Sequence, residues 1–207
     1  MIFEKKDYSR KNIMFTGAVL AAALVVNCLG SIIATKITFP LYLDSVLTIG
    51  VTALCGLIPG LLCAALSNGI LYFMDYTMLP FMSCHLVTAL LAWLVFVHED
   101  RKNAARPMFE RNQFYEIEAF LWAGVWSALS NAILGNFIAD ILFGARVNRQ
   151  NAECTVQGIY VVTRNLLYST YLAGFIENIT DKMLSAVASY GMYEGLRRLY
   201  RISFDKE

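Results

Sequence analysis

Long apolar runs without a charged side chain alternate with short polar stretches along most of the chain. These runs cover residues 12–35, 45–74, 76–98 and 119–139. A helix needs about 20 mainly apolar residues to cross the bilayer core, so three of the runs each match one crossing. The run 45–74 is too long for one crossing, and Pro59 and Gly60 at its centre favour a turn. It therefore predicts a helical hairpin.

The pattern predicts an all-α integral membrane protein that forms a single membrane domain over residues 1–207. Its six transmembrane helices are expected near residues 12–35, 41–58, 60–75, 79–97, 117–143 and 180–198. Composition agrees, because a chain with 57% hydrophobic and 16% charged residues is too apolar for an ordinary soluble domain of this length. The first apolar run is longer than the core of a signal peptide, so we expect the first helix to be retained.

The segment 155–176 is apolar but contains Arg164. It is expected to be an outer interfacial or re-entrant segment before the last helix, an outer extension of a tilted last helix, or a seventh crossing. Cytoplasmic loops are enriched in Lys and Arg, which favours six crossings. Six crossings place on one side the basic residues Lys5, Lys6, Arg10, Lys11, Arg101, Lys102, Arg106, Arg111, Arg197, Arg198, Arg201 and Lys206. The prediction is a multi-pass protein of the cell membrane with both termini cytoplasmic and no nucleic-acid partner.

A short motif occurs twice within the apolar runs. Residues 65–71 read ALSNGIL and residues 128–134 read ALSNAIL. Each copy places an asparagine, Asn68 or Asn131, in hydrocarbon, where an amide without a hydrogen-bond partner costs several kcal/mol. Each asparagine is expected either to face a polar cavity or to join two helices through hydrogen bonds.

Polar residues of the predicted helices concentrate toward the outer leaflet, which favours a cup open to the outside over a pore. Such a cup suits capture of a small molecule by apolar walls and a few polar groups. His85 alone is more typical of a packed, hydrogen-bonded histidine than of a ligand-binding residue or a base, and Asp75 and Asp140 are equally compatible with residues at helix ends. The candidate substrate-binding residues are Asn27, Asp44, Asn68, Tyr72, Asp75, His85, Asn131 and Asp140.

The inner half of the first helix carries small residues at a spacing of four. Gly17 with Ala21, and Ala18 with Ala22, would permit close approach of another helix. These four residues form a candidate partner-docking surface, although chance spacing of alanines is the alternative.

The sequence contains no recognisable catalytic or metal-binding motif. It has no HExxH, GxSxG or Walker-type pattern, and its five cysteines lack CxxC spacing. We therefore expect no enzyme activity, no cofactor and no metal, and any ATP-driven step would need a partner.

Several ordered motifs resemble the substrate-binding S components of energy-coupling factor (ECF) transporters, particularly the branch whose substrates are mostly unassigned. The motifs are LDSVLTI at 43–49, LIPG at 57–60 with LSN at 66–68, ALSN at 128–131 and ENITDK at 177–182. The resemblance extends from Gly17 to about Leu196. The family often has proline where this chain has Thr180.

The resemblance implies six transmembrane helices and high-affinity capture of a vitamin or related nutrient from outside the cell. It also implies that Ala18 and Ala22 dock onto a T component that joins two cytoplasmic ATPase subunits, and that the S component topples in the membrane to release its cargo. Asp181 and Lys182 are expected to contact the ligand or to pair with each other. A metal cargo is disfavoured, because the chain begins Met1-Ile2 without the Met-His start of metal-transporting members.

The sequence therefore predicts the substrate-specific subunit of an ATP-driven importer. A membrane sensor or scaffold that signals to a separate output protein is the second hypothesis. An intramembrane enzyme that uses Asp75, His85 or Asp140 is the third.

Overall fold

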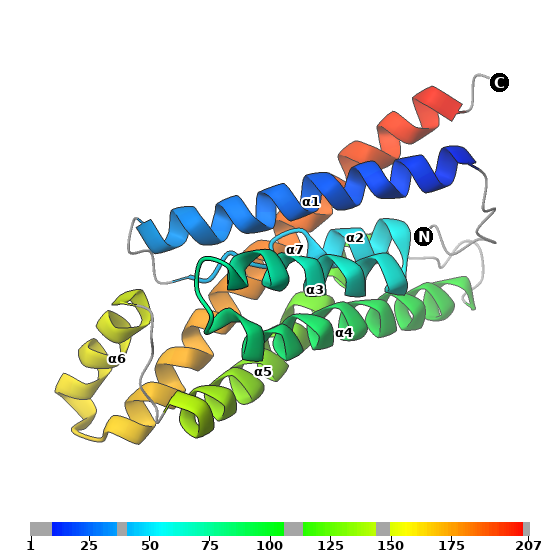
Figure 1. Cartoon of the computed structure of the whole chain (residues 1–207). Helices are drawn as coiled ribbons and strands as arrows, with labels where there is room; N and C mark the ends of the chain where they lie inside the picture. The colour runs from blue at the N-terminus through cyan, green and yellow to red at the C-terminus, as the bar shows by residue number, and fades with distance from the viewer. Residues whose placement is uncertain (1–9, 37–40, 106–113, 144–149, 205–207) are drawn as a thin grey trace.

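The computed structural model describes residues 10–36, 41–105, 114–143 and 150–204, and within these ranges every regular element is an α-helix. The helices are α1 (Arg10–Lys36), α2 (Thr48–Cys55), α3 (Leu57–Tyr72), α4 (Met78–Ala104), α5 (Tyr115–Phe143), α6 (Gln150–Thr163) and α7 (Leu166–Phe204). The fully buried α2 packs against α1, α3, α4 and α7, whereas α6 packs on α7 beyond one end of the bundle (Figure 1).

Three helical segments are long and apolar enough to cross a membrane: Asn12–Lys36, Met78–Ala104 and Tyr115–Phe143. Their outer faces carry large apolar side chains such as those of Trp122, Trp126 and Ile133 on α5. Extended apolar surfaces of this kind suit contact with lipid acyl chains. A membrane location is therefore plausible for this all-helical protein.

The second helix is shorter than the predicted range 41–58, because residues 41–47 form an irregular segment. Leu43 has a φ angle of 47°, and its backbone N–H donates to Asp181 Oδ1 at 2.8 Å. The N–H of Leu47 donates to Asn27 Oδ1 at 2.9 Å. Side chains from α1 and α7 thus replace helical hydrogen bonds, an arrangement that apolar patterning does not reveal.

The hairpin turn lies at Gly56, three residues before the predicted Pro59-Gly60 turn. Gly56 has a φ of 90°, a conformation that side chains disfavour. Pro59 lies in the first turn of α3, where its missing N–H leaves no hydrogen bond unmade. Gly60 instead allows close packing, since a Cβ atom there would lie 2.1 Å from Thr52 Oγ1. The predicted helix 60–75 therefore begins earlier and ends at Tyr72.

The last helix is much longer than the predicted range 180–198. Its 39 residues extend over about 58 Å at 1.5 Å per residue, roughly twice the thickness of the hydrocarbon core. Arg164, with a φ of 53°, separates it from α6, and Asn165 Oδ1 caps its start by accepting the N–H of Tyr168 at 3.1 Å. The segment 155–176 is thus shared between α6 and the first turns of α7.

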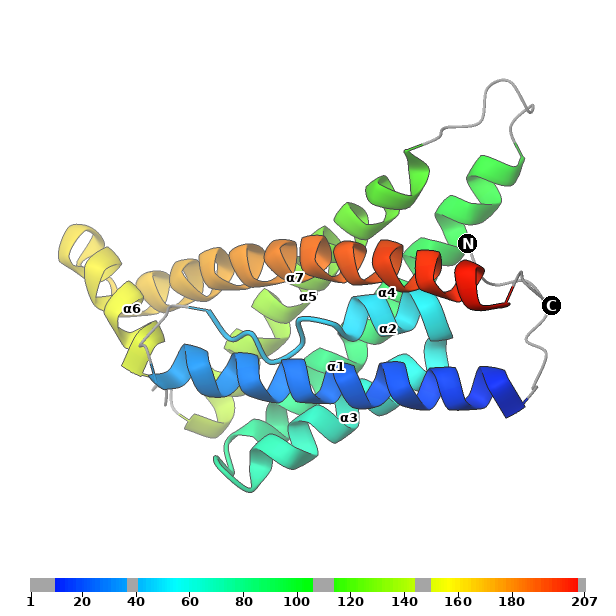
Figure 2. The ribbon, with the colours of Figure 1, turned by 90° about the horizontal axis from the view of Figure 1, so that it is seen from above.

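The two ends of the bundle differ in character. The starts of α1 and α5 and the ends of α4 and α7 lie at one end (Figures 1 and 2). An aromatic cluster packs that half, with ring centroids 4.9 Å apart for Phe96 and Phe120 and 5.3 Å apart for Phe120 and Tyr193. Buried polar side chains gather in the other half, which contains the candidate site.

Candidate functional site

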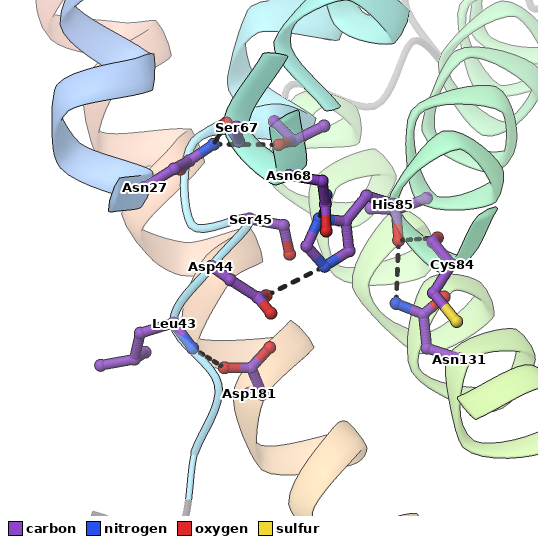
Figure 3. Close-up of polar contacts among 12 residues, drawn as sticks. Asn27, Leu43, Asp44, Ser45, Ser67, Asn68, Cys84, His85, Asn131 and Asp181 are labelled. Atoms are coloured by element: carbon purple, nitrogen blue, oxygen red, sulfur yellow. Dashed lines mark hydrogen bonds and ion pairs between the residues drawn. The ribbon is translucent and has the colours of Figure 1, made fainter. Parts of the chain in front are cut away.

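Asn27 joins α1 to the α2–α3 hairpin. Its Nδ2 donates to Ser67 Oγ (Figure 3) and to Thr48 Oγ1, both at 3.2 Å, and its Oδ1 accepts the N–H of Leu47. The side chain is fully buried, and these bonds use both its donor and its acceptor. Asn27 was predicted to bind substrate, but in the structure it joins helices through hydrogen bonds and is not among the residues that line the cavity described below.

A buried charge cluster connects the irregular segment to the middle of α7. Lys182 Nζ donates to Asp181 Oδ2 at 2.7 Å and to Ser45 Oγ at 2.6 Å, and it lies 3.8 Å from Asp44 Oδ1. Asp181 also accepts the N–H of Leu43 (Figure 3). The predicted pairing of Asp181 with Lys182 is therefore present. The charges of Asp181 and Lys182 neutralise each other inside the bundle. Helix α7 therefore continues through residues 181 and 182, close to residue 180, where the sequence predicted that the last helix begins.

His85 extends this cluster toward α3. Its Nε2 lies 3.1 Å from Asp44 Oδ1 (Figure 3). Asn68 Nδ2 donates one hydrogen to the carbonyl of Ala64 at 3.0 Å and directs the other at His85 Nδ1. Nδ1 therefore accepts, and Nε2 carries the hydrogen that faces Asp44. Asn68 orients the ring and lies behind it.

Asn131, the second asparagine of the repeat, also bonds to α4. Its Nδ2 donates to Thr88 Oγ1 at 3.0 Å, and Thr88 donates in turn to the carbonyl of Cys84 at 3.0 Å. The side chain is 3% exposed, and its Oδ1 has no hydrogen-bond partner among the described residues. Both copies of the repeat thus contact α4, which lies between α3 and α5, and do not join α3 to α5 directly.

A cavity of about 90 Å³ lies beside these side chains, between the irregular segment, α4, α5, α6 and α7. One water needs about 10–15 Å³, so the space accommodates several waters or a small organic molecule. Phe81 and Phe143 form part of an aromatic wall, with rings 12° from parallel and centroids 6.1 Å apart. The polar lining residues are Tyr42, Asp44, Thr77, His85, Asn131, Asn136, Thr170, Glu177, Asn178 and Lys182.

Of the eight predicted substrate-binding residues, Asp44, His85 and Asn131 line the cavity. They come from the irregular segment, α4 and α5, and the fold brings them together. Asn27 and Asn68 lie behind the wall, in the hydrogen bonds described above.

Three other predicted residues lie outside the cavity lining. Tyr72 is 42% exposed at the end of α3. Asp75 Oδ1 accepts the backbone N–H of Thr77 at 2.9 Å and its hydroxyl at 2.6 Å, which fixes the turn before α4. Asp140 lies on the exposed face of α5. Depth along a helix suggested these residues, but the direction of each side chain around the helix decides whether it reaches the cavity.

Glu177 and Asn178 line the cavity, although sequence reasoning did not assign them to the site. Glu177 Oε2 accepts the hydroxyl of Tyr42 at 3.2 Å. Together with Gly174 and Lys182 they follow a helical spacing of three and four, so one face of α7 turns toward the cavity. That periodicity was visible in the sequence, but the last helix was expected to begin only at residue 180.

The small residues of α1 lie on its outer side. Gly17, Ala18, Ala21 and Ala22 are exposed, and a Cβ atom at Gly17 would meet nothing within 4 Å. The opposite side, with Val19 and Ala23, packs into the bundle. This surface is accessible to another helix.

Comparisons with protein families, with characterised proteins and with solved structures find no match for the chain. The resemblance to ECF S components therefore depends on the sequence motifs alone. Within the described ranges, no three His, Cys, Asp or Glu side chains gather in a way that would hold a metal ion.

Proposed function

We propose that this chain is the substrate-capture subunit of an ECF-type importer and that the cavity between α4, α5 and α7 binds a vitamin or related small nutrient. The observation that carries the proposal is a cavity inside the helical bundle whose mainly apolar wall includes several converging polar side chains. Polar groups are unfavourable at membrane depth unless they are paired or used for binding. An aromatic wall with a few convergent polar groups is typical of small-molecule sites.

The proposed orientation has six crossings, formed by α1, α2 with its irregular approach, α3, α4, α5 and α7. The end of α4 carries Arg101 and Lys102, and the last part of α7 carries Arg197 and Arg198. Both ends lie at the end of the bundle away from the cavity (Figure 2). Since basic residues favour the cytoplasmic side, this arrangement supports cytoplasmic termini and a cavity near the outer face.

The proposed partner is a T component that joins two cytoplasmic ATPases and docks on the exposed small residues of α1. Small residues let two helix backbones approach closely in a membrane. The chain shows no phosphate-binding loop in its sequence, so uptake would take its energy from those partners.

The test uses Gly135, which lines the cavity and has room for a side chain, because a Cβ atom there would meet nothing within 4 Å. Gly135→Phe should fill the cavity with little strain on the helices. Gly69→Phe on α3 is the matched control, since Gly69 also has open space but lies outside the cavity lining. Purified wild-type protein and both variants are analysed by native mass spectrometry and by thermal shift across a vitamin panel.

The proposal predicts that the wild type and Gly69→Phe carry or bind the same small molecule and that Gly135→Phe loses it. Absence of any bound molecule in the wild type, together with no thermal shift across the panel, would contradict the capture function. Retention of the molecule by Gly135→Phe would place binding elsewhere.

A further inference from the structure

The hydrogen bonds of Asn131 fix which way its amide faces. The hydroxyl of Thr88 has a single hydrogen, and it donates that hydrogen to the carbonyl of Cys84 at 3.0 Å. The Thr88 hydroxyl has no second hydrogen to donate to Asn131, so its oxygen can only accept a hydrogen bond from that side chain. The amide nitrogen of Asn131 therefore faces Thr88, and Oδ1 faces away from Thr88. The orientation follows from donor and acceptor counts.

Oδ1 of Asn131 is consequently an acceptor of fixed orientation on a residue that lines the cavity. Asn131 lines the cavity, is 3% exposed, and its Oδ1 has no hydrogen-bond partner within the part of the chain that the structure describes. A buried carbonyl oxygen without a partner is unfavourable, and native proteins satisfy nearly all such atoms. A ligand with a hydrogen-bond donor would satisfy it.

Other donor groups of the cavity wall already form hydrogen bonds within the protein. Lys182 Nζ donates to Asp181 and Ser45, and Asn178 Nδ2 donates to the carbonyl of Gly174 at 2.7 Å. These bonds leave few donors for an acceptor-rich or anionic ligand.

Carboxylates and aromatic rings complete the wall. Asp44 and Glu177 both line the cavity, and a ligand carboxylate placed beside them would meet like charge in a poorly solvated space. Phe81 and Phe143 offer ring surfaces against which a planar ligand would pack.

We propose that Asn131 is the specificity-determining residue of the cavity, which takes small, planar, nitrogen-containing rings with an N–H donor and rejects carboxylates. Asn131 Oδ1 accepts the ligand N–H, and Thr88 acts as a positioning residue that keeps Oδ1 turned toward the ligand. This inference rests on the proposed capture function and specifies its substrate class.

The test compares four probes at constant ionic strength: benzimidazole, N-methylbenzimidazole, the isomer methylated on the carbon ring, and a benzimidazolecarboxylate. The two methyl isomers have the same size, but only the carbon-methylated one retains the N–H. Binding to the full chain in lipid nanodiscs is measured by calorimetry. The N–H isomer should bind about tenfold tighter than the N-methyl isomer, and the carboxylate should bind weakest.

Variants assign the preference to Asn131. Asn131→Leu should reduce the ratio between the methyl isomers to about one, because it removes the acceptor. Thr88→Val, which keeps the shape of the side chain, should reduce the ratio severalfold, since the amide is then free to turn. Ile133→Ala should leave the ratio unchanged, because Ile133 is 70% exposed on α5 and does not line the cavity. Thr88→Val gives an independent result if Asn131→Leu does not fold.

Equal binding of the two methyl isomers by the wild type, or tightest binding of the carboxylate, would overturn the assignment while leaving capture intact. An unchanged ratio in both Asn131→Leu and Thr88→Val would do the same. If the wild type binds none of the four probes and carries no small molecule after purification, the capture function itself fails, and the inference fails with it.

Discussion

Replacing Lys182 by methionine should destabilise the fold strongly. The lysine side chain is 2% exposed, and it neutralises Asp181, which is fully buried, and lies near Asp44. Removing one partner of a buried ion pair leaves an uncompensated charge and costs about 3–5 kcal/mol. The exposed pair of Arg198 with Glu194 is the matched control, since such pairs contribute only about 0.3–0.5 kcal/mol.

The assay is reversible unfolding in mixed micelles, followed by tryptophan fluorescence and circular dichroism. Lys182→Met should lower the free energy of unfolding by several kcal/mol, and Arg198→Met by less than about 1 kcal/mol. Adding Asp181→Asn to Lys182→Met should recover much of the loss, because the amide oxygen still accepts the N–H of Leu43 without a charge. The reasoning is refuted if Lys182→Met is no worse than Arg198→Met, or if the double variant is as unstable as the single one.

Gly60→Ala should destabilise by about 1–3 kcal/mol, since its Cβ would lie 2.1 Å from Thr52 Oγ1, whereas Gly69→Ala has open space and should stabilise by roughly 0.5–1 kcal/mol. The same unfolding assay checks both, and equal effects would contradict the packing argument. Ala18→Leu with Ala22→Leu should leave ligand binding and stability unchanged but prevent co-purification with a T component and its ATPases, because both residues are exposed on α1. Unchanged co-purification would exclude this surface as the docking site.

The long helices follow directly from the sequence. The predicted ranges 12–35, 79–97 and 117–143 correspond to α1, α4 and α5, which begin within two residues of the predicted positions. The length of an uncharged apolar run is a local property, so it indicates such helices without knowledge of their neighbours. The same pattern overestimated the second helix, because residues 41–47 are mostly apolar but bond to distant side chains.

The candidate site was predictable only in part. Polar residues within the predicted helices indicated that Asp44, His85 and Asn131 have a special role, and all three line the cavity. Asn27 shares that sequence signature, yet its donor and acceptor are both used within the fold. A sequence shows that a polar group is buried, but it does not show which neighbour satisfies it.

The sequence by itself determined that the chain is apolar and helical, where most long helices lie, and several of the polar residues that the helices bury. The tertiary structure decided which of those residues surround one cavity and which bind only each other. The physical reason is distance along the chain: Leu43 meets Asp181, and Asn131 meets Thr88, through contacts that no local pattern encodes. The repeated asparagine has one sequence signature but two environments, since Asn68 orients His85 from behind the cavity wall, whereas Asn131 lines the cavity.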